Sequence, residues 1–441
     1  MTMKIKFKKP IVTAWVAGLT ILVCSAVNAS DIELYKPAQT SKTTLMFMLD
    51  VSGSMANENR LTNLKTGMKD LLNGNPAKNI QKLDDDLYVG LAVFSGTASN
   101  GDGTGRIQLG AKRLGETYKF DQEQDQQKFK VVETRSRLCI FVCLPWSAWE
   151  IKNGDKQKCK TNKMDIVTGK CNEWEVSNET IDSTYIISEE EVECSSAILN
   201  CTEQKRTFIY VKKVTIGSYT ETHRSRLLKV VDGMVAHGGT PTAFAYAEAG
   251  AYMLGETTSG VNNSGYSAAV SDIKDSGKYK KPETMPTASI DTSQCSGYGI
   301  YFLTDGVPEY GKNAVSVDIL KKSLGAKGSS FSCSAASLGG RGSYYNSENN
   351  TNNWTCIGEY TKALLDPEKN PLKVSIKTAV VGFGSTMDQA NPAGNTRNDI
   401  LDAQAWGALG KGGFYRGSDR ASVVNSVNQF LQVLATNIPS V

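Results

Sequence analysis

The sequence predicts an α/β fold, a doubly wound and mostly parallel sheet with helices on both faces. Short, nearly continuous apolar runs recur at residues 44–49, 88–94, 300–303 and 374–383. Such runs suit strands that are buried on both faces, as in a parallel sheet covered by helices. Segments with helical spacing alternate with these runs, and that alternation is typical of an open α/β sheet.

Three segments place apolar residues on one helical face. The first contains Leu61, Leu64, Met68, Leu71 and Leu72. The second contains Leu227, Leu228, Val231, Met234 and Val235. The third contains Val423, Val424, Val427, Phe430, Leu431 and Leu434. Each pattern predicts a helix that packs against the sheet.

Three stretches interrupt this pattern, so we expect one large domain over residues 30–441 with three insertions. Residues 115–217 are polar and contain six cysteines, and stretches such as 207–214 alternate in polarity. They predict a disulfide-stapled, cysteine-rich and partly β insertion. Residues 256–296 are rich in Ser, Gly and Asn and predict a long loop, and residues 325–353 are nearly low-complexity.

The first 29 residues have the pattern of a cleaved signal peptide. Four lysines precede an apolar run at residues 11–23, and Val27-Asn28-Ala29 places small side chains at the cleavage positions. An uncleaved anchor is less favoured because the run is shorter than the roughly 20 residues that span a bilayer. Lipidation at Cys24 is disfavoured because Val23 occupies a position that requires a very small residue. We therefore expect an exported protein without stable membrane insertion.

Charge and cysteine content narrow the possible partners and bound groups. The chain has 49 basic and 45 acidic residues, and without the four signal lysines both counts are 45. A neutral balance argues against nucleic acid as a partner. Nine cysteines follow Cys24, and export predicts that most form disulfides while the odd one stays free or pairs with another molecule. Cys333 and Cys356 are placed to tie the ends of the third insertion. Structural zinc is disfavoured because Cys139-x-x-x-Cys143 has no matching second pair.

Oxygen-bearing side chains follow three of the predicted elements. The first strand leads into Asp50-Val51-Ser52-Gly53-Ser54, the second predicted helix leads into a loop that contains Thr240, and the strand at 300–303 leads into Asp305. Each piece alone is typical of a turn or a helix cap. In a doubly wound sheet, however, ligands gather beyond the carboxyl ends of the strands, so the three loops can meet there. Together they predict a site for one hard cation.

In this order the five residues resemble the complete metal-ion-dependent adhesion site of von Willebrand factor A domains. The resemblance covers the core elements from residue 43 to about 436, with the insertions outside the pattern. It implies that Ser52 and Ser54 bind the metal directly, that Asp50 and Asp305 act mainly through water, and that Thr240 does either. Mg²⁺ is the implied ion, with Mn²⁺ or Ca²⁺ as substitutes. Since two carboxylates leave the octahedral cation with open positions and residual charge, an acidic group of a partner can complete the site.

A narrower resemblance involves the PilC/PilY-type adhesins of type IV pili. It rests on residues 31–37, 43–50 and 238–243 and on Leu303-Thr304-Asp305-Gly306-Val307-Pro308. These proteins also carry a large cysteine-containing insertion within the A domain. The sequence departs from them because it ends at Val441 without the C-terminal β-propeller typical of the family. This puts propeller-dependent roles in pilus extension in doubt, and both a stand-alone paralogue and a truncated reading frame stay open.

Catalysis is not expected, because His223 and His237 are the only imidazoles and neither belongs to a nucleophile motif. Two function classes remain. The first is an adhesin or biogenesis factor on the cell surface or pilus (fimbrium), which binds pilus subunits or an acidic group on a protein or matrix ligand. The second is a periplasmic envelope assembly or sensing factor that uses the same metal site.

Overall fold

The computed structural model describes residues 42–96, 105–137, 144–160, 163, 170–182, 185–194, 203–287, 297–306, 308, 313–333, 338, 354–385, 387 and 394–435. The signal segment 1–29 lies outside these residues, as do Cys139, Cys143, Cys201 and Cys295. The chain divides into two compact units. Unit 1 comprises the chain up to Glu116 and again from Arg224, and unit 2 comprises Thr117–His223.

Unit 1 contains a six-stranded, mostly parallel sheet. The strands are β1 (Thr44–Asp50), β2 (Tyr88–Phe94), β3 (Gly105–Arg113), β11 (Tyr298–Thr304), β12 (Ile376–Phe383) and β13 (Lys411–Gly417). Their order is β13-β12-β11-β1-β2-β3, and only the β2–β3 pair is antiparallel. Three of the four apolar runs seen in the sequence lie within these strands, and the fourth begins two residues before β12, so the expected mixed α/β fold with a mostly parallel sheet is confirmed.

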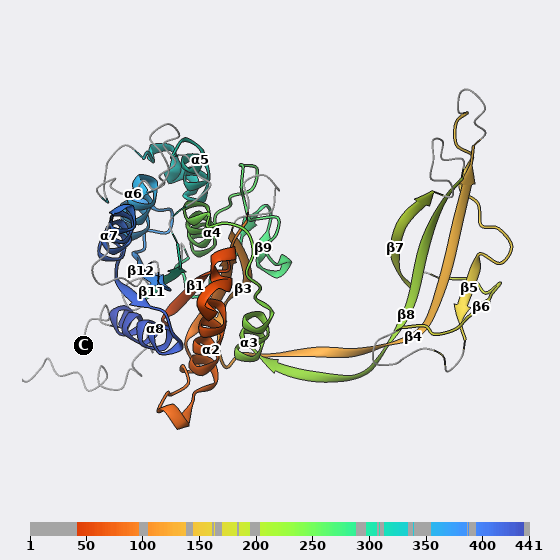
Figure 1. Cartoon of the computed structure of the whole chain (residues 1–441), viewed down its shortest axis with the longest axis horizontal. Coiled ribbons are helices and arrows are strands. Elements are labelled where there is room, and N and C mark those ends of the chain that lie inside the picture. The colour runs from red at the N-terminus through yellow and green to blue at the C-terminus, as the bar shows by residue number, and fades with distance from the viewer. Residues whose placement is uncertain are drawn as a thin grey trace, which may run out of the picture. The chain divides into compact units, whose positions relative to one another are not determined.

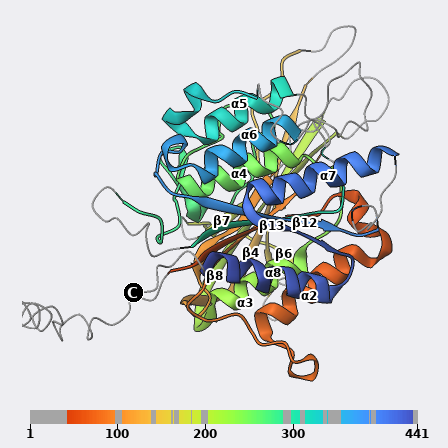
Figure 2. The same ribbon diagram turned by 90° about the vertical axis from the view of Figure 1, so that its left-hand side faces the viewer.

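Helices lie on both sides of this sheet. Figure 2 shows α4 (Thr242–Leu254), α5 (Asn313–Ser323), α6 (Trp354–Leu365) and α7 (Gly394–Leu409) on one side of β12 and β13. On the other side lie α2 (Arg60–Asn73), α3 (His223–Gly233) and α8 (Arg420–Ala435). In Figure 1, the strands β1, β3, β11 and β12 are labelled between these two sets of helices.

The central strands are buried on both faces, which explains their continuous apolar runs. Every residue of β1, β2 and β11 is buried. Alternate side chains of β1 enter two different cores: Phe47 packs with residues of α2, α3 and α8, whereas Met48 packs with residues of α4, α6 and α7. One sequence prediction is wrong in detail. Val235, expected on the buried face of a helix, is 67% exposed, because α3 ends at Gly233 and the chain then turns toward the sheet.

Unit 2 is a five-stranded sheet with little hydrophobic core. Its strand order is β6 (Trp174–Val176), β5 (Lys156–Cys159), β4 (Thr117–Ser136), β8 (Glu203–Thr222) and β7 (Tyr185–Cys194), and all of its pairs are antiparallel. The buried apolar side chains among its described residues are Phe129, Val131 and Cys159. Cation–π contacts supplement them, since the Arg135 guanidinium lies 4.4 Å from the Trp149 ring.

Two disulfides are present among the described residues. Cys159–Cys171 closes a short loop in unit 2, and Cys333–Cys356 joins the ends of the Ser- and Gly-rich segment in unit 1, as the sequence predicted. The segment that follows α4 contains short elements: a 3-10 turn at Ser271–Ile273 and the strand pair β9 (Lys274–Asp275) and β10 (Lys278–Tyr279). Further 3-10 turns lie at Gly53–Asn59, Pro76–Lys78, Gly325–Ser330 and Pro367–Lys369. Within the described residues, no helix combines the length and apolarity needed to cross a membrane.

Candidate metal centre

The five residues predicted to bind a cation lie at or just after the ends of strands and helices. Asp50 is the last residue of β1, and Ser52 and Ser54 lie in the turn that follows it. Asp305 directly follows β11, the parallel neighbour of β1, and Thr240 lies in the loop between α3 and α4. Because β1 and β11 run parallel and in register, their carboxyl ends lie side by side.

Hydrogen bonds join both serines to Asp305. Ser54 Oγ donates to Asp305 Oδ1 at 2.7 Å, and Ser52 Oγ donates to the same oxygen at 3.4 Å. The two hydroxyl oxygens are 3.0 Å apart. Side chains that are 251 residues apart in the sequence therefore meet at one point.

The Asp50 carboxylate is buried beside this cluster. Its Oδ1 accepts the Ser52 backbone N–H at 2.8 Å, and its Oδ2 accepts the Thr304 hydroxyl at 2.9 Å. Burial, together with the negative charge of Asp305, raises the pKa of Asp50 to about 7. Two carboxylates thus share a place from which water is largely excluded, which favours a compensating positive charge.

Thr240 is the fifth predicted residue, and it faces the turn that Asp305 begins. Its side chain is buried, and a Cβ placed on Gly306 would lie 3.6 Å from Thr240 Oγ1. Described hydrogen bonds thus connect Asp50, Ser52, Ser54 and Asp305, whereas Thr240 approaches the group from the adjacent loop.

Backbone hydrogen bonds fix the Thr240 loop against the serine turn. Gly53 N–H donates to Gly238 O at 2.7 Å, and Gly239 N–H donates to Gly96 O at 2.9 Å. Gly238 has φ +68°, and an added Cβ would lie 2.8 Å from Gly96 N. Only glycine fits this left-handed conformation and close approach without strain.

The donor set fits a hard cation. Two carboxylates and three hydroxyls offer only oxygen, which Mg²⁺ and Ca²⁺ prefer over nitrogen or sulfur. Within the described residues, no group of three or more His, Cys, Asp or Glu side chains could hold a metal ion. The candidate site therefore depends on hydroxyl groups as much as on carboxylates, and its two negative charges match one divalent cation.

A buried arginine, which the sequence pattern does not reveal, also lies at this site. Arg60 Nη1 donates to Asp305 Oδ2 at 2.9 Å, and the Arg60 side chain is 6% exposed. Glu58 and Ser385 bind the other edge of the guanidinium. A buried arginine is recognisable only once its partners are placed, because in the sequence Arg60 stands in a polar stretch before an amphipathic helix.

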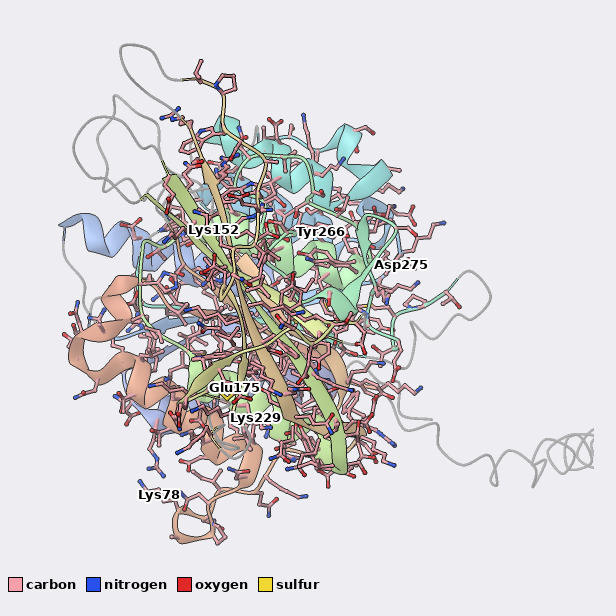
Figure 3. All side chains as sticks on the ribbon, turned by 90° about the vertical axis from the view of Figure 1, so that its right-hand side faces the viewer. Lys78, Lys152, Glu175, Lys229, Tyr266 and Asp275 are labelled. Atoms are coloured by element: carbon pink, nitrogen blue, oxygen red, sulfur yellow. A yellow bond between two sulfur atoms is a disulfide. The ribbon has the colours of Figure 1, made fainter. Side chains whose placement is uncertain are left out.

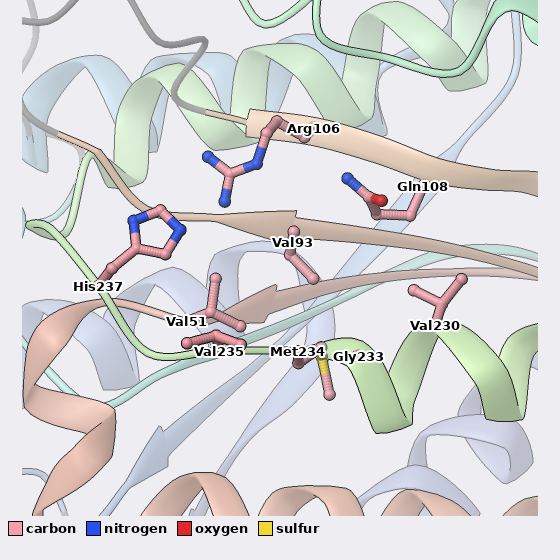
Figure 4. Close-up of a pocket in the computed structure, with 9 residues that line it drawn as sticks. All are labelled: Val51, Val93, Arg106, Gln108, Val230, Gly233, Met234, Val235 and His237. Atoms are coloured by element: carbon pink, nitrogen blue, oxygen red, sulfur yellow. The ribbon is translucent and has the colours of Figure 1, made fainter. Parts of the chain in front are cut away.

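A pocket of about 290 Å³ lies next to the same loops. Figure 4 shows Arg106 and Gln108 of β3 on one side of it and Val51 and Met234 on another. Arg106 Nη2 donates to Ser95 Oγ at 2.8 Å, and the Ser95 hydroxyl also contacts the His237 ring at 3.2 Å. His237, one of the two histidines in the sequence, thus lines this pocket.

Comparison with known proteins gives few matches. No family model matches the chain, and no curated protein matches it. Two solved structures of the pilus adhesin SpaC from Lactobacillus rhamnosus GG are similar to it. The first has a TM-score of 0.36 and 12% identity, covering 90% of this chain and 31% of that chain. The second, an open conformation, has a TM-score of 0.34 and 14% identity, covering 90% and 30%. The chain thus spans about a third of these adhesins, and similarity at this level carries no argument about function.

Proposed function

We propose that unit 1 is a von Willebrand factor A-type domain with a doubly wound sheet, and that it binds an acidic group of a partner through a divalent cation. The observation that carries this proposal is the hydrogen-bonded cluster of Ser52, Ser54 and Asp305 beside Asp50, at the carboxyl ends of two adjacent parallel strands. Nothing in this role requires a chemical reaction, so we propose a binding module and not an enzyme.

Each residue has a distinct part in this proposal. Ser52 and Ser54 bind the cation directly, Asp50 and Asp305 bind mainly through water, and Thr240 binds directly or through water. The cation, Mg²⁺ or else Mn²⁺ or Ca²⁺, supplies an open coordination position for a carboxylate of the partner. Binding is therefore expected to require the cation and to be reversed by chelators.

Calorimetry on the purified mature protein tests the metal site. We expect one Mg²⁺ or Mn²⁺ site, which the combined change Asp50→Ala and Asp305→Ala abolishes. Since a ligand that binds only the folded state stabilises it, cation at about 100 times its Kd should add about 2.7 kcal/mol to the unfolding free energy. The matched control is Asp232→Ala with Asp272→Ala, because these two carboxylates are exposed and neither is a proposed ligand of the cation. Equal binding by the wild type and the Asp50/Asp305 variant would show that the assignment is wrong.

The biological role is a separate proposal. We propose that the protein is a type IV pilus-associated adhesin or biogenesis factor at the cell surface. It rests on the predicted signal peptide, the metal-site residues and the sequence resemblance to PilC/PilY-type adhesins. Deleting the gene should reduce attachment or surface piliation. Returning a gene that carries both Ser52→Ala and Ser54→Ala to the deletion strain should restore the protein level but not attachment. Absence of the protein from sheared pili, together with unchanged attachment, would favour the periplasmic alternative. Surface labelling of intact cells separates the two locations.

A further inference from the structure

Arg60 places a fixed positive charge directly behind the candidate metal centre. It is the first residue of α2, and its Nη1 donates to Asp305 Oδ2 at 2.9 Å. The opposite oxygen of the same carboxylate accepts the Ser54 hydroxyl. Asp305 therefore lies between a proposed cation ligand and a guanidinium, and its side chain is 0% exposed.

Hydrogen bonds also fix the other nitrogen atoms of the Arg60 guanidinium. Its Nε and Nη2 donate to Glu58 Oε2 at 3.1 and 2.8 Å, and Nη2 also donates to Ser385 Oγ at 3.3 Å. Ser385 in turn donates its backbone N–H and its hydroxyl to Glu58. Gly384 leaves the necessary space, since an added Cβ would lie 2.3 Å from Arg60 Nε. With four hydrogen bonds and a buried side chain, Arg60 is not available to contact a partner.

The backbone before Arg60 is also unusual. Glu58 and Asn59 both have positive φ, at 53° and 56°. Two consecutive non-glycine residues in this region are costly unless the surrounding structure enforces them. Here the bonds from Arg60 and Ser385 to the Glu58 carboxylate hold the turn. The chain thus accepts backbone strain in the same turn that directs Arg60 toward Asp305.

We infer that Arg60 is a positioning residue that sets the charge preference of the site, weakening cation binding and strengthening the binding of an acidic partner group. This inference rests on the proposed function. The charges of Asp50 and Asp305 balance a divalent cation, and the buried guanidinium adds one positive charge. The Glu58 carboxylate lies on the far side of Arg60 and its side chain is 49% exposed, so water screens its charge more strongly. An occupied centre would therefore attract anions in particular.

Neutralising Arg60 should move the two affinities in opposite directions. Arg60→Gln keeps a hydrogen-bond donor for Asp305 but removes the charge. We expect Mn²⁺ to bind about tenfold more tightly and a carboxylate to bind the Mn²⁺-loaded protein about tenfold more weakly, given charges this close in a poorly solvated site. Calorimetry measures the first affinity, and Mn²⁺-enhanced ¹⁹F relaxation of trifluoroacetate measures the second.

Three companion variants separate charge from structure. Arg60→Lys keeps the charge and should stay close to wild type in both affinities. Glu58→Gln removes the charge but keeps an oxygen that accepts hydrogen bonds from Arg60 and Ser385, and it should act in the reverse sense, with weaker Mn²⁺ and tighter trifluoroacetate binding. Arg420→Gln breaks an ion pair with Asp70, where the partners lie 2.7 Å apart between α2 and α8, and should change neither affinity.

The possible outcomes are distinct. Opposite shifts in Arg60→Gln, together with reversed shifts in Glu58→Gln, support the inference. If the wild type binds Mn²⁺ but neither variant changes either affinity, or if both affinities fall together, the inference is overturned while the proposed function stands. A wild-type protein that binds no Mn²⁺ overturns both.

Discussion

Glu248 is a buried carboxylate whose described hydrogen-bond partners are all neutral. Its Oε1 accepts the Thr258 hydroxyl and the Gly265 backbone N–H, both at 2.6 Å. Its Oε2 accepts the Tyr279 hydroxyl at 2.7 Å. These bonds attach the segment after α4 to the helix itself. Burial outweighs them and raises the pKa of Glu248 to about 7.

This pKa predicts a pH-dependent stability. The ordinary value is 4.5, so folding favours the protonated form. The stabilisation is fully present below about pH 4.5 and is lost as the pH rises to about 7, a change of about 3 kcal/mol in unfolding free energy. Urea unfolding with saturating Mg²⁺ should show this fall in the wild type and not in Glu248→Gln. Parallel pH profiles for the two proteins would contradict the prediction.

At the residue scale, the sequence predicts those parts of the candidate site that directly follow a recognisable strand. Asp50 and Asp305 each follow an apolar run that had to be a buried strand, and the carboxyl ends of neighbouring parallel strands meet. Arg60 was not predictable, because its direction depends on the left-handed turn at Glu58 and Asn59. Asn59 tolerates this conformation, but Glu58 rarely adopts it, so the sequence alone does not mark two consecutive left-handed residues here.

At the scale of elements, the contact between α2 and α8 depends on a glycine. Gly67 lies in α2, and an added Cβ would lie 2.7 Å from Val423 Cβ and 2.9 Å from Arg420 O of α8. The second atom belongs to the backbone and cannot rotate away. The two helices therefore approach closely at the one position of this face that has no side chain.

Gly67→Ala tests that contact. Overpacking costs about 1–3 kcal/mol. This exceeds the gain of about 1 kcal/mol that alanine brings to an unhindered helix interior. We expect a lower unfolding free energy, measured by urea denaturation. Gly233→Ala at the end of α3 is the matched control, because its Cβ would meet nothing within 4 Å, and it should be neutral or stabilising. Equal effects at both sites would contradict the close packing.

Edge strands were the elements that the sequence left unpredicted. β13 contains Gly412, Gly413 and Gly417 and therefore lacks an apolar run. β3 buries only alternate residues, such as Ile107 and Leu109, because one of its faces is partly open to solvent. A continuous apolar run is typical of a strand that is covered on both faces, whereas a strand at the edge of the sheet lacks this pattern.

At the scale of the whole molecule, the chain leaves unit 1 before unit 2 and returns to unit 1 after it at almost the same point. Arg224 N–H donates to Leu114 O at 3.1 Å, so the two ends of the chain that flank unit 2 are already joined within unit 1. Composition placed this insertion at residues 115–217, and the compact unit covers Thr117–His223. Unit 2 carries side chains of both signs, among them Lys152 and Glu175, which Figure 3 labels, and ion pairs such as Lys158–Glu175 and Arg206–Glu133 join them.

Removing unit 2 should therefore leave unit 1 folded. Replacing Thr117–His223 by a short Gly-Ser link closes a gap that the Leu114–Arg224 hydrogen bond already spans. We expect cooperative urea unfolding and a Mn²⁺ affinity within about threefold of the full chain, since ligands on one unit act independently of distant changes. Loss of folding would show that unit 2 supports the sheet, whereas loss of Mn²⁺ binding alone would place part of the site outside unit 1.

The same joined ends have a mechanical consequence. Tension along the chain passes from β3 to α3 through contacts inside unit 1, and the polypeptide of unit 2 carries no load while those contacts hold. β1, at the centre of the sheet, can leave only by shearing from β2 and β11 at once, along nearly its whole length. If the protein is pulled from its two ends, unit 2 therefore stays unextended at first. Its chain length is released only after the sheet that carries the candidate metal centre begins to rupture.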